Sequence, residues 1–209
     1  MALRYGILLV PEPAFTATAY RARHIICGQY GSWAAEMHML HLTLTGFFQC
    51  SDSSVDELNA GLAAIAENSR RSAPRFSMSH HGVFPMPGSS GDISLDFGQG
   101  ARNDPLQVLQ RNTAGLLEQT ANVEPEPESP SGPSRPHVPL MQYANLPPAV
   151  FSDAVEFARG VVEHLQLPEA TRAWRLLLVR FRSEGAGDDW GDGRWAADLS
   201  WELLHSYSL

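Results

Sequence analysis

Lysine is absent from this chain of 209 residues, so all of its basic side chains are arginines. Acidic residues number 23 against 15 basic ones, which gives a formal net charge of −8 at pH 7. A net acidic chain lacks the broad electropositive surface with which proteins hold long nucleic acids. A local arginine cluster could still hold one or two phosphates. The charge therefore argues against a general binder of long nucleic acids, but not against a site for a small phosphorylated ligand.

Cysteine and long apolar runs are also scarce. Only Cys27 and Cys50 occur, so no disulfide framework is expected and a reducing cytoplasm fits. No stretch reaches the roughly 18 apolar residues that cross a bilayer. The apolar N-terminal stretch is short, runs into prolines and lacks a small-residue cleavage site, so it predicts a first strand and not a secretion signal. We expect a cytoplasmic protein without a membrane partner.

The remaining composition suits one domain or a compact pair of lobes. Hydrophobic residues make up 44% of the chain and charged residues 18%, enough for a core. Apolar periodicity and turn residues predict strands over 4–10, 37–48, 75–84, 92–98, 137–144, 173–184 and 194–206. They predict helices over 14–33, closing near Gly28 and Gly31, and over 54–71, 104–119 and 147–165. Asp52 or Ser53 is expected to cap the second helix, and Asp104 the third, with Pro105 at its first position. Hairpin-like strand pairs between helices favour an α+β fold with antiparallel sheets over a doubly wound parallel sheet.

One segment, at about residues 123–136, is rich in proline, glutamate and serine. Such a composition buries little, so it predicts a solvated loop. We place the seam between two halves just before it. Both halves contain a histidine-bearing strand, a helix and a hairpin, so residues 1–209 are predicted to form a single two-lobed domain.

Two of the predicted strands, 37–48 and 137–144, carry the most informative histidines. Side chains alternate between the faces of a strand, so His38 and His41 are expected on opposite faces unless a bulge intervenes. His41 then shares a face with Thr43, and His137 shares one with Tyr143. A histidine in such a place can fill a core, bind a metal or transfer a proton, and one strand alone does not decide between them.

The stretches His41-Leu42-Thr43-Leu44 and His137-Val138-Pro139-Leu140 together resemble the paired His-x-Thr/Ser-x motifs of the 2H phosphoesterase superfamily, which includes 2′-5′ RNA ligase-like proteins and cyclic phosphodiesterases. The resemblance extends to the segment ending in Gly82-Val83-Phe84-Pro85, to the strand and helix that follow it, and to the closing hairpin at 174–195. It covers nearly the whole chain in the expected order.

The resemblance implies a two-lobed α+β fold with two antiparallel sheets, flanked by helices, that meet in a central cleft. It implies that His41 and His137 act as a general acid and base on a cyclic phosphodiester, with Thr43 as a donor to the phosphate. Histidine suits this pairing because it titrates near neutrality. No metal or organic cofactor is implied. The expected substrate is a nucleoside 2′,3′-cyclic phosphate or a short RNA end that carries one, and the expected protein is a monomer without an obligate protein partner.

This chain departs from the motif at Pro139, where a threonine or serine is expected. Proline has neither a hydroxyl nor a backbone N–H. Tyr143, Arg135 or Ser134 could supply the missing phosphate donor. The departure keeps two alternatives open beside RNA end processing or 2′-5′ ligation: a protein that binds a nucleotide phosphate without turnover, and a binder of some unrelated small molecule.

Other candidate residues have weaker support. Trp190 and Trp195 flank a glycine- and aspartate-rich turn and could stack on a base, or simply pack. Arg180 and Arg182 share a strand face and could contact a phosphate, although a solvated pair is the simpler interpretation. The adjacent His80 and His81 suggest a metal site, but neighbours in a strand point apart and no Cys or carboxylate lies at ligand spacing.

Overall fold

The computed structural model describes residues 2–86, 91–101, 104–125, 135–187, 190 and 193–209. Helices are α1 (Pro13–Tyr30), α2 (Asp52–Ser72), α3 (Pro105–Gln119) and α4 (Pro148–His164), with the 3-10 turns η1 (Ala34–Met37) and η2 (Arg194–Ala197). Strands are β1 (Ala2–Pro11), β2 (Leu42–Thr43), β3 (Phe48–Cys50), β4 (Ser77–Ser79), β5 (Val83–Pro85), β6 (Ile93–Asp96), β7 (Val123–Pro125), β8 (His137–Met141), β9 (Ala170–Ser183) and β10 (Ser200–Ser208). Within these residues, none of the helices combines the length and apolar character that a bilayer span requires.

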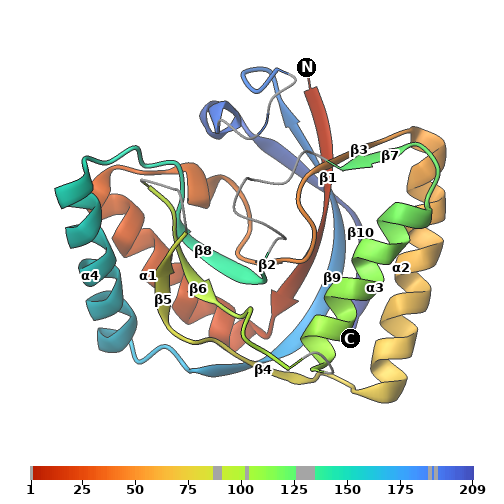
Figure 1. The fold of residues 1–209 in the computed structure, drawn as a ribbon, viewed down its shortest axis with the longest axis horizontal. Helices are drawn as coiled ribbons and strands as arrows, with labels where there is room; N and C mark the ends of the chain where they lie inside the picture. The colour runs from red at the N-terminus through yellow and green to blue at the C-terminus, as the bar shows by residue number, and fades with distance from the viewer. Residues whose placement is uncertain (1, 87–90, 102–103, 126–134, 188–189, 191–192) are drawn as a thin grey trace.

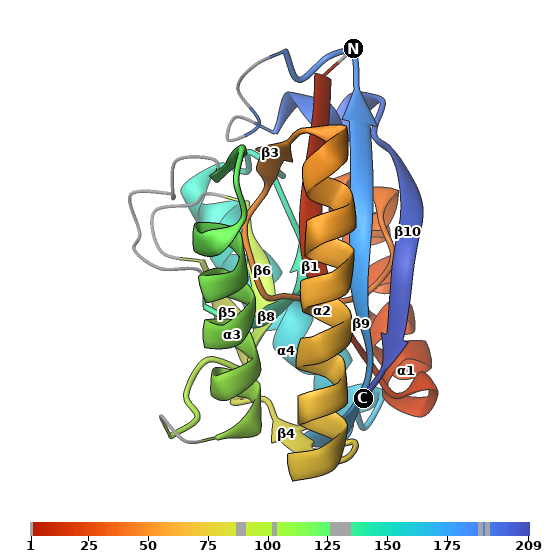
Figure 2. The ribbon, with the colours of Figure 1, turned by 90° about the vertical axis from the view of Figure 1, so that its right-hand side faces the viewer.

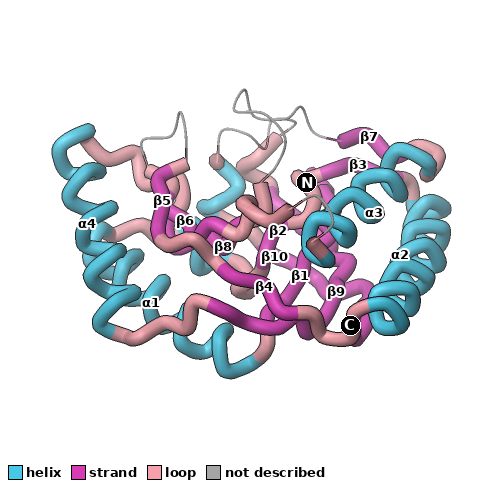
Figure 3. Tube along the Cα trace, turned by 60° about the horizontal axis from the view of Figure 1, so that its bottom comes forward, coloured by secondary structure: helices cyan, strands magenta, loops and turns pink. Residues whose placement is uncertain are grey.

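The strands form two antiparallel sheets, as the α+β prediction expected. The larger has the order β10-β9-β1-β3-β7, with β2 also pairing β1 and β4 also pairing β9, and the smaller has the order β5-β6-β8. Helices α1 and α4 pack together beside the small sheet, while α2 and α3 pack together beside the large one (Figure 1). Turning the molecule shows α2 and α3 lying over β1 and β9 (Figure 2). In Figure 3 the two helix pairs lie at opposite ends and the strands lie between them.

The lobes are not the two halves of the sequence. The C-terminal strands β9 and β10 join β1 in the large sheet, and β8 joins β5 and β6 in the small one. The predicted seam before residue 123 therefore does not divide the lobes, because strand pairing links segments that lie far apart in the chain. Residues 123–125, expected in the solvated loop, form β7 and pair with β3. The rest of that loop up to residue 134 lies outside the described residues.

Both faces of the central strands are buried, which explains their unbroken apolar runs. On β1, Ile7 and Leu9 face the main core, whereas Leu8 faces a second cluster that contains Phe181, Trp190 and Trp195. Successive side chains of a strand point to opposite faces, so this division follows from the pleat. Burying each such side chain contributes about 1.5–3 kcal/mol. The second cluster forms one wall of the pocket described below.

The predicted strand over residues 37–48 is wrong in an informative way. It consists of η1, an extended stretch and two short strands. Leu8 pairs with Thr43 and Tyr5 pairs with Phe48, so the chain advances five residues while β1 advances three. Two surplus residues must loop out, and the Thr45 hydroxyl accepts the Ile7 N–H at 3.2 Å within this bulge. Such a bulge re-aims side chains and is common beside functional sites.

Other boundaries also differ in detail. The predicted strand 75–84 divides into β4, which pairs with β9, and β5, which pairs with β6. The predicted last strand begins with η2 before β10. Ser51 caps α2 by accepting the Ser54 N–H, one residue before the expected Asp52 or Ser53. The Asp104 cap with Pro105 behind it is confirmed, and Gly31, in the left-handed conformation at φ 66°, ends α1. Gly28 lies inside that helix.

Candidate active site

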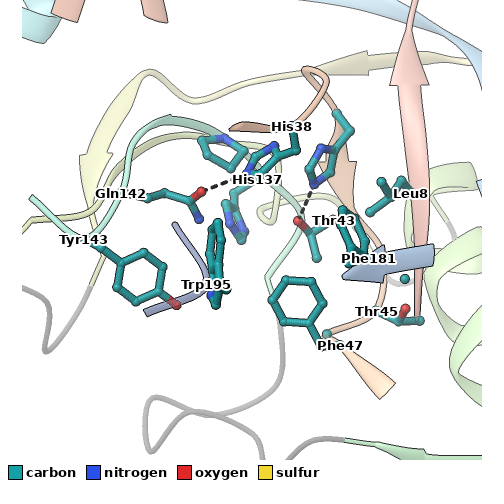
Figure 4. A pocket seen from close by; sticks show the side chains of 14 residues that line it. Leu8, His38, Thr43, Thr45, Phe47, His137, Gln142, Tyr143, Phe181 and Trp195 are labelled. Atoms are coloured by element: carbon teal, nitrogen blue, oxygen red, sulfur yellow. Dashed lines mark hydrogen bonds between the residues drawn. The ribbon is translucent and has the colours of Figure 1, made fainter. Parts of the chain in front are cut away.

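A pocket of about 150 Å³ opens between the two sheets, on the face of β1 that carries Leu8. Its wall combines three histidines with hydroxyl, amide and aromatic side chains, most of which Figure 4 labels. The lining residues are Gly6, Leu8, His38, His41, Thr43, Thr45, Gly46, Phe47, His137, Pro139, Gln142, Tyr143, Phe181 and Trp195. The two predicted catalytic histidines thus share one pocket, although they come from different segments.

His41 lies just before β2 and is buried, with 5% of its surface exposed. Its Nδ1 is 2.8 Å from the Met39 carbonyl oxygen and its Nε2 is 3.2 Å from Thr43 Oγ1. Because a carbonyl only accepts, Nδ1 carries the proton and Nε2 accepts from the Thr43 hydroxyl. This tautomer leaves a basic nitrogen in the pocket beside a hydroxyl group.

His137 begins β8 and is held in the same way. Its Nδ1 donates to the Arg135 carbonyl at 2.7 Å, which fixes the ring and directs Nε2 away from the backbone. The strand pairs with β6, where Asp96 lies opposite His137. Two imidazoles with their Nδ1 atoms bonded to carbonyls therefore present Nε2 atoms for proton transfer.

Burial keeps these imidazoles neutral in the free protein. It lowers the pKa of His41 well below the ordinary value, and the neighbouring His38 and His137 act in the same direction. Burial also lowers the pKa of His137, against the opposing effects of the Arg135 carbonyl and the charges of Asp92 and Asp96. A carboxylate environment thus favours protonation of His137 more than that of His41.

His38 does not point away from His41, as strand parity predicted. Both rings line the pocket, and their centroids are 5.0 Å apart. The 3-10 turn η1 and the extended residues after it break the alternation, so the three-residue spacing no longer separates the two side chains. Burial lowers the pKa of His38 to about 4. Its Nε2 lies 3.1 Å from Gln142 Oε1, a contact drawn in Figure 4.

The predicted phosphate-binding residues fall into two groups. Thr43 and Tyr143 line the pocket. Arg135 is not among the lining residues: its guanidinium pairs with the buried Asp96, and it serves the site through the carbonyl that holds His137. Ser134 lies outside the described residues. The pair Arg180 and Arg182 bonds to Glu202 across the β9–β10 ladder and does not line the pocket.

The two tryptophans also separate. Trp195 lines the pocket and packs edge-on against Tyr143, with ring centroids 5.3 Å apart and planes at 86°. Trp190 is buried behind Phe47 at 5.0 Å and is not a lining residue. Trp195 Nε1 donates to the Trp190 carbonyl, which ties the two together. Trp190 thus supports the pocket wall, and Trp195 is the one that contributes to its surface.

The adjacent His80 and His81 differ in their surroundings. His80 is buried, with Nε2 3.1 Å from the Pro168 carbonyl and Nδ1 accepting the Gly82 N–H. These bonds use both ring nitrogens in the backbone around β4 and β5. In the part of the chain that is described, no three His, Cys, Asp or Glu side chains are placed to hold a metal ion.

Sequence reasoning missed Gln142, Thr45 and the pocket-facing side of His38. Gln142 and Tyr143 follow β8 directly, and Tyr143 has φ 50° in the left-handed region. The backbone turns there, so the two-residue alternation that grouped His137 with Tyr143 does not extend to Gln142. A polar residue directly after the second motif was the available signal.

Gly193 supports the position of Tyr143, and its replacement is a test of the pocket wall. It has φ 76°, and a Cβ added there would overlap the Tyr143 ring. Gly193→Ala is therefore expected to destabilise the fold by about 2–4 kcal/mol, which combines a left-handed alanine with a steric clash. Gly187→Ala is a matched control, because Gly187 has φ 58° but open space where its Cβ would lie. Thermal and urea unfolding of both variants should show the larger loss at Gly193, and equal losses would remove the clash from the explanation.

Solved structures of similar fold cover nearly the whole chain. A crystal structure described as a phosphoesterase covers 100% of this chain and 99% of its own, with a TM-score of 0.59 and 14% identity. Apo LigT from E. coli covers 100% of this chain and 99% of its own, with a TM-score of 0.55 and 16% identity. The same E. coli protein complexed with 3′-AMP covers 99% and 97%, with a TM-score of 0.53 and 16% identity.

No model of a known protein family matches the chain, and no curated protein matches it in sequence. The similarity to the solved structures therefore concerns the fold, over its full length. The two-lobed α+β fold that the paired histidine motifs predicted is confirmed, and it is the fold of LigT and the 2H phosphoesterases.

Proposed function

We propose that this protein is a metal-independent phosphoesterase that opens a cyclic phosphodiester with His41 and His137. The observation that carries the proposal is the pairing of these imidazoles in one pocket, each held through Nδ1 by a carbonyl. The fold shared with LigT supports it, since that protein has been crystallised with 3′-AMP and with phosphate. We place the chain in the same superfamily on both grounds.

The reaction needs a base and an acid on opposite sides of phosphorus. One Nε2 removes a proton from water as its oxygen bonds to phosphorus, and the other Nε2 gives a proton to the ribose oxygen as its bond to phosphorus breaks. The product is a nucleoside monophosphate, and no redox change occurs. The Thr43 hydroxyl lies beside His41 and can donate to a non-bridging phosphate oxygen as charge develops there.

The low pKa values of both histidines fit an anionic substrate. A neutral imidazole is ready to act as the base, and a phosphate anion in the pocket favours protonation of its partner. Since the carboxylates of Asp92 and Asp96 act on His137 and not on His41, we assign His137 as the group that enters protonated. His41, next to the Thr43 hydroxyl, is then the base.

The pocket suits a small substrate. Its volume of about 150 Å³ is below the 300–1,000 Å³ typical of sites that enclose a drug-sized ligand, so a cyclic phosphate with its ribose fits better than a whole nucleotide. None of its lining residues is basic other than histidine. A long RNA would need a basic track, and its binding would weaken steeply with salt. A nucleoside 2′,3′-cyclic phosphate or a short RNA end is thus preferred to an extended strand.

Turnover of 2′,3′-cyclic AMP, 3′,5′-cyclic AMP and a 2′-5′-linked dinucleotide tests the proposal. Formation of monophosphate from the 2′,3′-cyclic compound, above the level of a His41→Ala/His137→Ala double variant, is the expected result. Product that forms only from the 2′-5′ linkage would favour the ligase or end-processing alternative. Phosphate binding without turnover of any substrate would favour a non-catalytic binder, which the missing hydroxyl at Pro139 makes a specific alternative. The cytoplasmic location and the monomeric state stay predictions.

The pH dependence of kcat/KM provides an independent test. Activity needs one imidazole protonated and the other neutral, and burial lowers the pKa of both in the free protein. Above these pKa values the active form falls by up to about tenfold per pH unit. We therefore expect kcat/KM to rise as the pH falls from 8 to 6, and kcat to hold to a higher pH because bound phosphate favours imidazolium. A kcat/KM that is flat or falls over this range, with circular dichroism showing a folded protein, would contradict the pKa argument.

A further inference from the structure

The pocket contains a hydrogen-bonded pair, His38 and Gln142, to which the two-histidine mechanism gives no role. The two residues are 104 positions apart and come from the segment after η1 and the turn after β8. Both line the pocket, and His38 is buried with 7% of its surface exposed. A buried polar pair at a catalytic wall calls for a chemical explanation, because burying such groups is costly unless they are satisfied.

The hydrogen-bond network settles how the pair is oriented. The Met39 carbonyl lies 2.8 Å from Nδ1 of His41 and 3.2 Å from Nδ1 of His38, so the shorter bond belongs to His41. Gln142 Oε1 faces His38 Nε2 at 3.1 Å, and an amide oxygen only accepts. His38 therefore donates from Nε2, and this bond fixes the rotation of the amide. Burial, which lowers the pKa of His38 to about 4, keeps the ring a neutral single donor.

Fixing the oxygen of Gln142 on His38 leaves its amide nitrogen directed away from that ring, as Figure 4 shows. Among the described residues, no hydrogen-bond partner of this nitrogen is found. An amide nitrogen carries two N–H donors, and here they belong to a side chain that lines the histidine pocket. The arrangement is that of a donor held ready for a ligand.

Pro139 explains why such a donor is needed. It lines the same pocket, two residues after His137, and has no hydroxyl to offer a phosphate. Thr43 stands two residues after His41 and has one. Of the other candidates, Arg135 is paired with Asp96 outside the pocket lining, which leaves Gln142 and Tyr143.

We propose that Gln142, held by His38, donates a hydrogen bond to a phosphate oxygen of the substrate in place of the hydroxyl that Pro139 lacks. This inference rests on the proposed phosphoesterase function, which it deepens. Gln142 is assigned as a residue that touches the substrate, and His38 as a positioning residue that acts through it. The pocket would then hold phosphate between the Thr43 hydroxyl on one side and the Gln142 amide on the other.

The test compares substitutions at positions 142, 139 and 38 on 2′,3′-cyclic AMP. Gln142→Leu removes the donor and should lower kcat/KM on the order of a hundredfold, as the loss of one oxyanion donor does elsewhere. Gln142→Glu keeps the size but presents an anion, and should be at least as damaging. Adding Pro139→Thr to Gln142→Leu should recover about tenfold or more, because it restores a hydroxyl at the motif position. Unchanged kcat/KM in Gln142→Leu, or a hundredfold loss in Tyr143→Phe instead, would overturn the assignment.

The positioning role of His38 has a readout that a purely structural role would not share. His38→Leu should lower kcat/KM about tenfold in the native background but hardly at all in the Gln142→Leu background, since the two residues act as a unit. His38→Gln, which retains an N–H for Gln142 Oε1, should restore most of the loss. Equal losses in both backgrounds would assign His38 to stability alone.

Binding of inorganic phosphate separates this inference from the proposed function. If the native protein hydrolyses no cyclic phosphate but binds phosphate, the function fails while the donor assignment is still tested: Gln142→Leu should weaken that binding at least tenfold by calorimetry. Equal affinity in the two proteins would overturn the assignment. A native protein that neither turns over nor binds phosphate would overturn both.

Discussion

Replacing either His41 or His137 with alanine is expected to lower kcat on 2′,3′-cyclic AMP by about 10²–10⁴-fold, the usual contribution of a general acid or base. Each imidazole presents Nε2 to the pocket because its Nδ1 is bonded to a carbonyl, so neither has a substitute for its proton transfer. The double variant should be little worse than the more damaged single variant, because an acid and a base act as a unit. The release of monophosphate, followed over time, measures all three.

His164→Ala is the matched control for these substitutions. His164 is exposed in the last turn of α4 and does not line the pocket. Its replacement should leave kcat unchanged. A His41→Ala variant that is folded, as judged by near-UV circular dichroism, and retains more than a tenth of native kcat would contradict its assignment as the base. The same criterion applies to His137 as the acid.

His41 and His137 could be found from the sequence because each belongs to a short motif with a hydroxyl or proline at fixed spacing. Their meeting in one pocket confirms that the motifs belong together. His38 could not be placed, because the prediction assumed one unbroken strand over 37–48. The two surplus residues of the bulge arise from pairing with β1, a long-range contact that local sequence does not encode.

The same distinction applies to the fold. Helix ends were predictable where a local capping residue marks them, as at Gly31 and Asp104. The composition of the lobes was not, because β9 crosses back to β1 and β8 returns to β6 after long intervals of chain. Element types follow from periodicity, whereas sheet order follows from packing that only the folded chain establishes.

A loss of stability in acid is the second large expected effect, and it follows from the same buried histidines. Burial lowers the pKa of His38 to about 4 and lowers those of His41 and His137 as well. In the unfolded chain each imidazole titrates near its ordinary pKa of about 6.5. Above that pH both states are neutral and the fold has its full stability. Below it the unfolded chain takes up protons that the folded chain resists, so the free energy of unfolding falls with falling pH.

The size of this effect is large relative to the stability of a typical domain. For His38 alone, a pKa of about 4 in the folded state corresponds to about 3 kcal/mol lost between pH 6.5 and 4. Typical domains have a free energy of unfolding of about 5–15 kcal/mol. The charge of Arg23, which donates to the His38 carbonyl, acts in the same direction on the pKa of His38. We therefore expect the protein to unfold in mild acid, with urea midpoints that fall steadily from pH 7 to pH 4.5.

Comparison with His38→Gln isolates the histidine from the carboxylates, which also titrate toward pH 4. The variant costs stability at pH 7 by weakening the pocket wall, but it has no imidazole to protonate. Its deficit relative to the native protein should shrink by about 2 kcal/mol between pH 7 and pH 4.5, as read from urea unfolding at each pH. His164→Gln, at an exposed site, should show no such change. A deficit for His38→Gln that stays constant with pH would mean that His38 titrates alike in the folded and unfolded chain, and that its burial does not keep it neutral. Phosphate should counteract the acid loss in the native protein, because an anion in the pocket favours the protonated imidazoles.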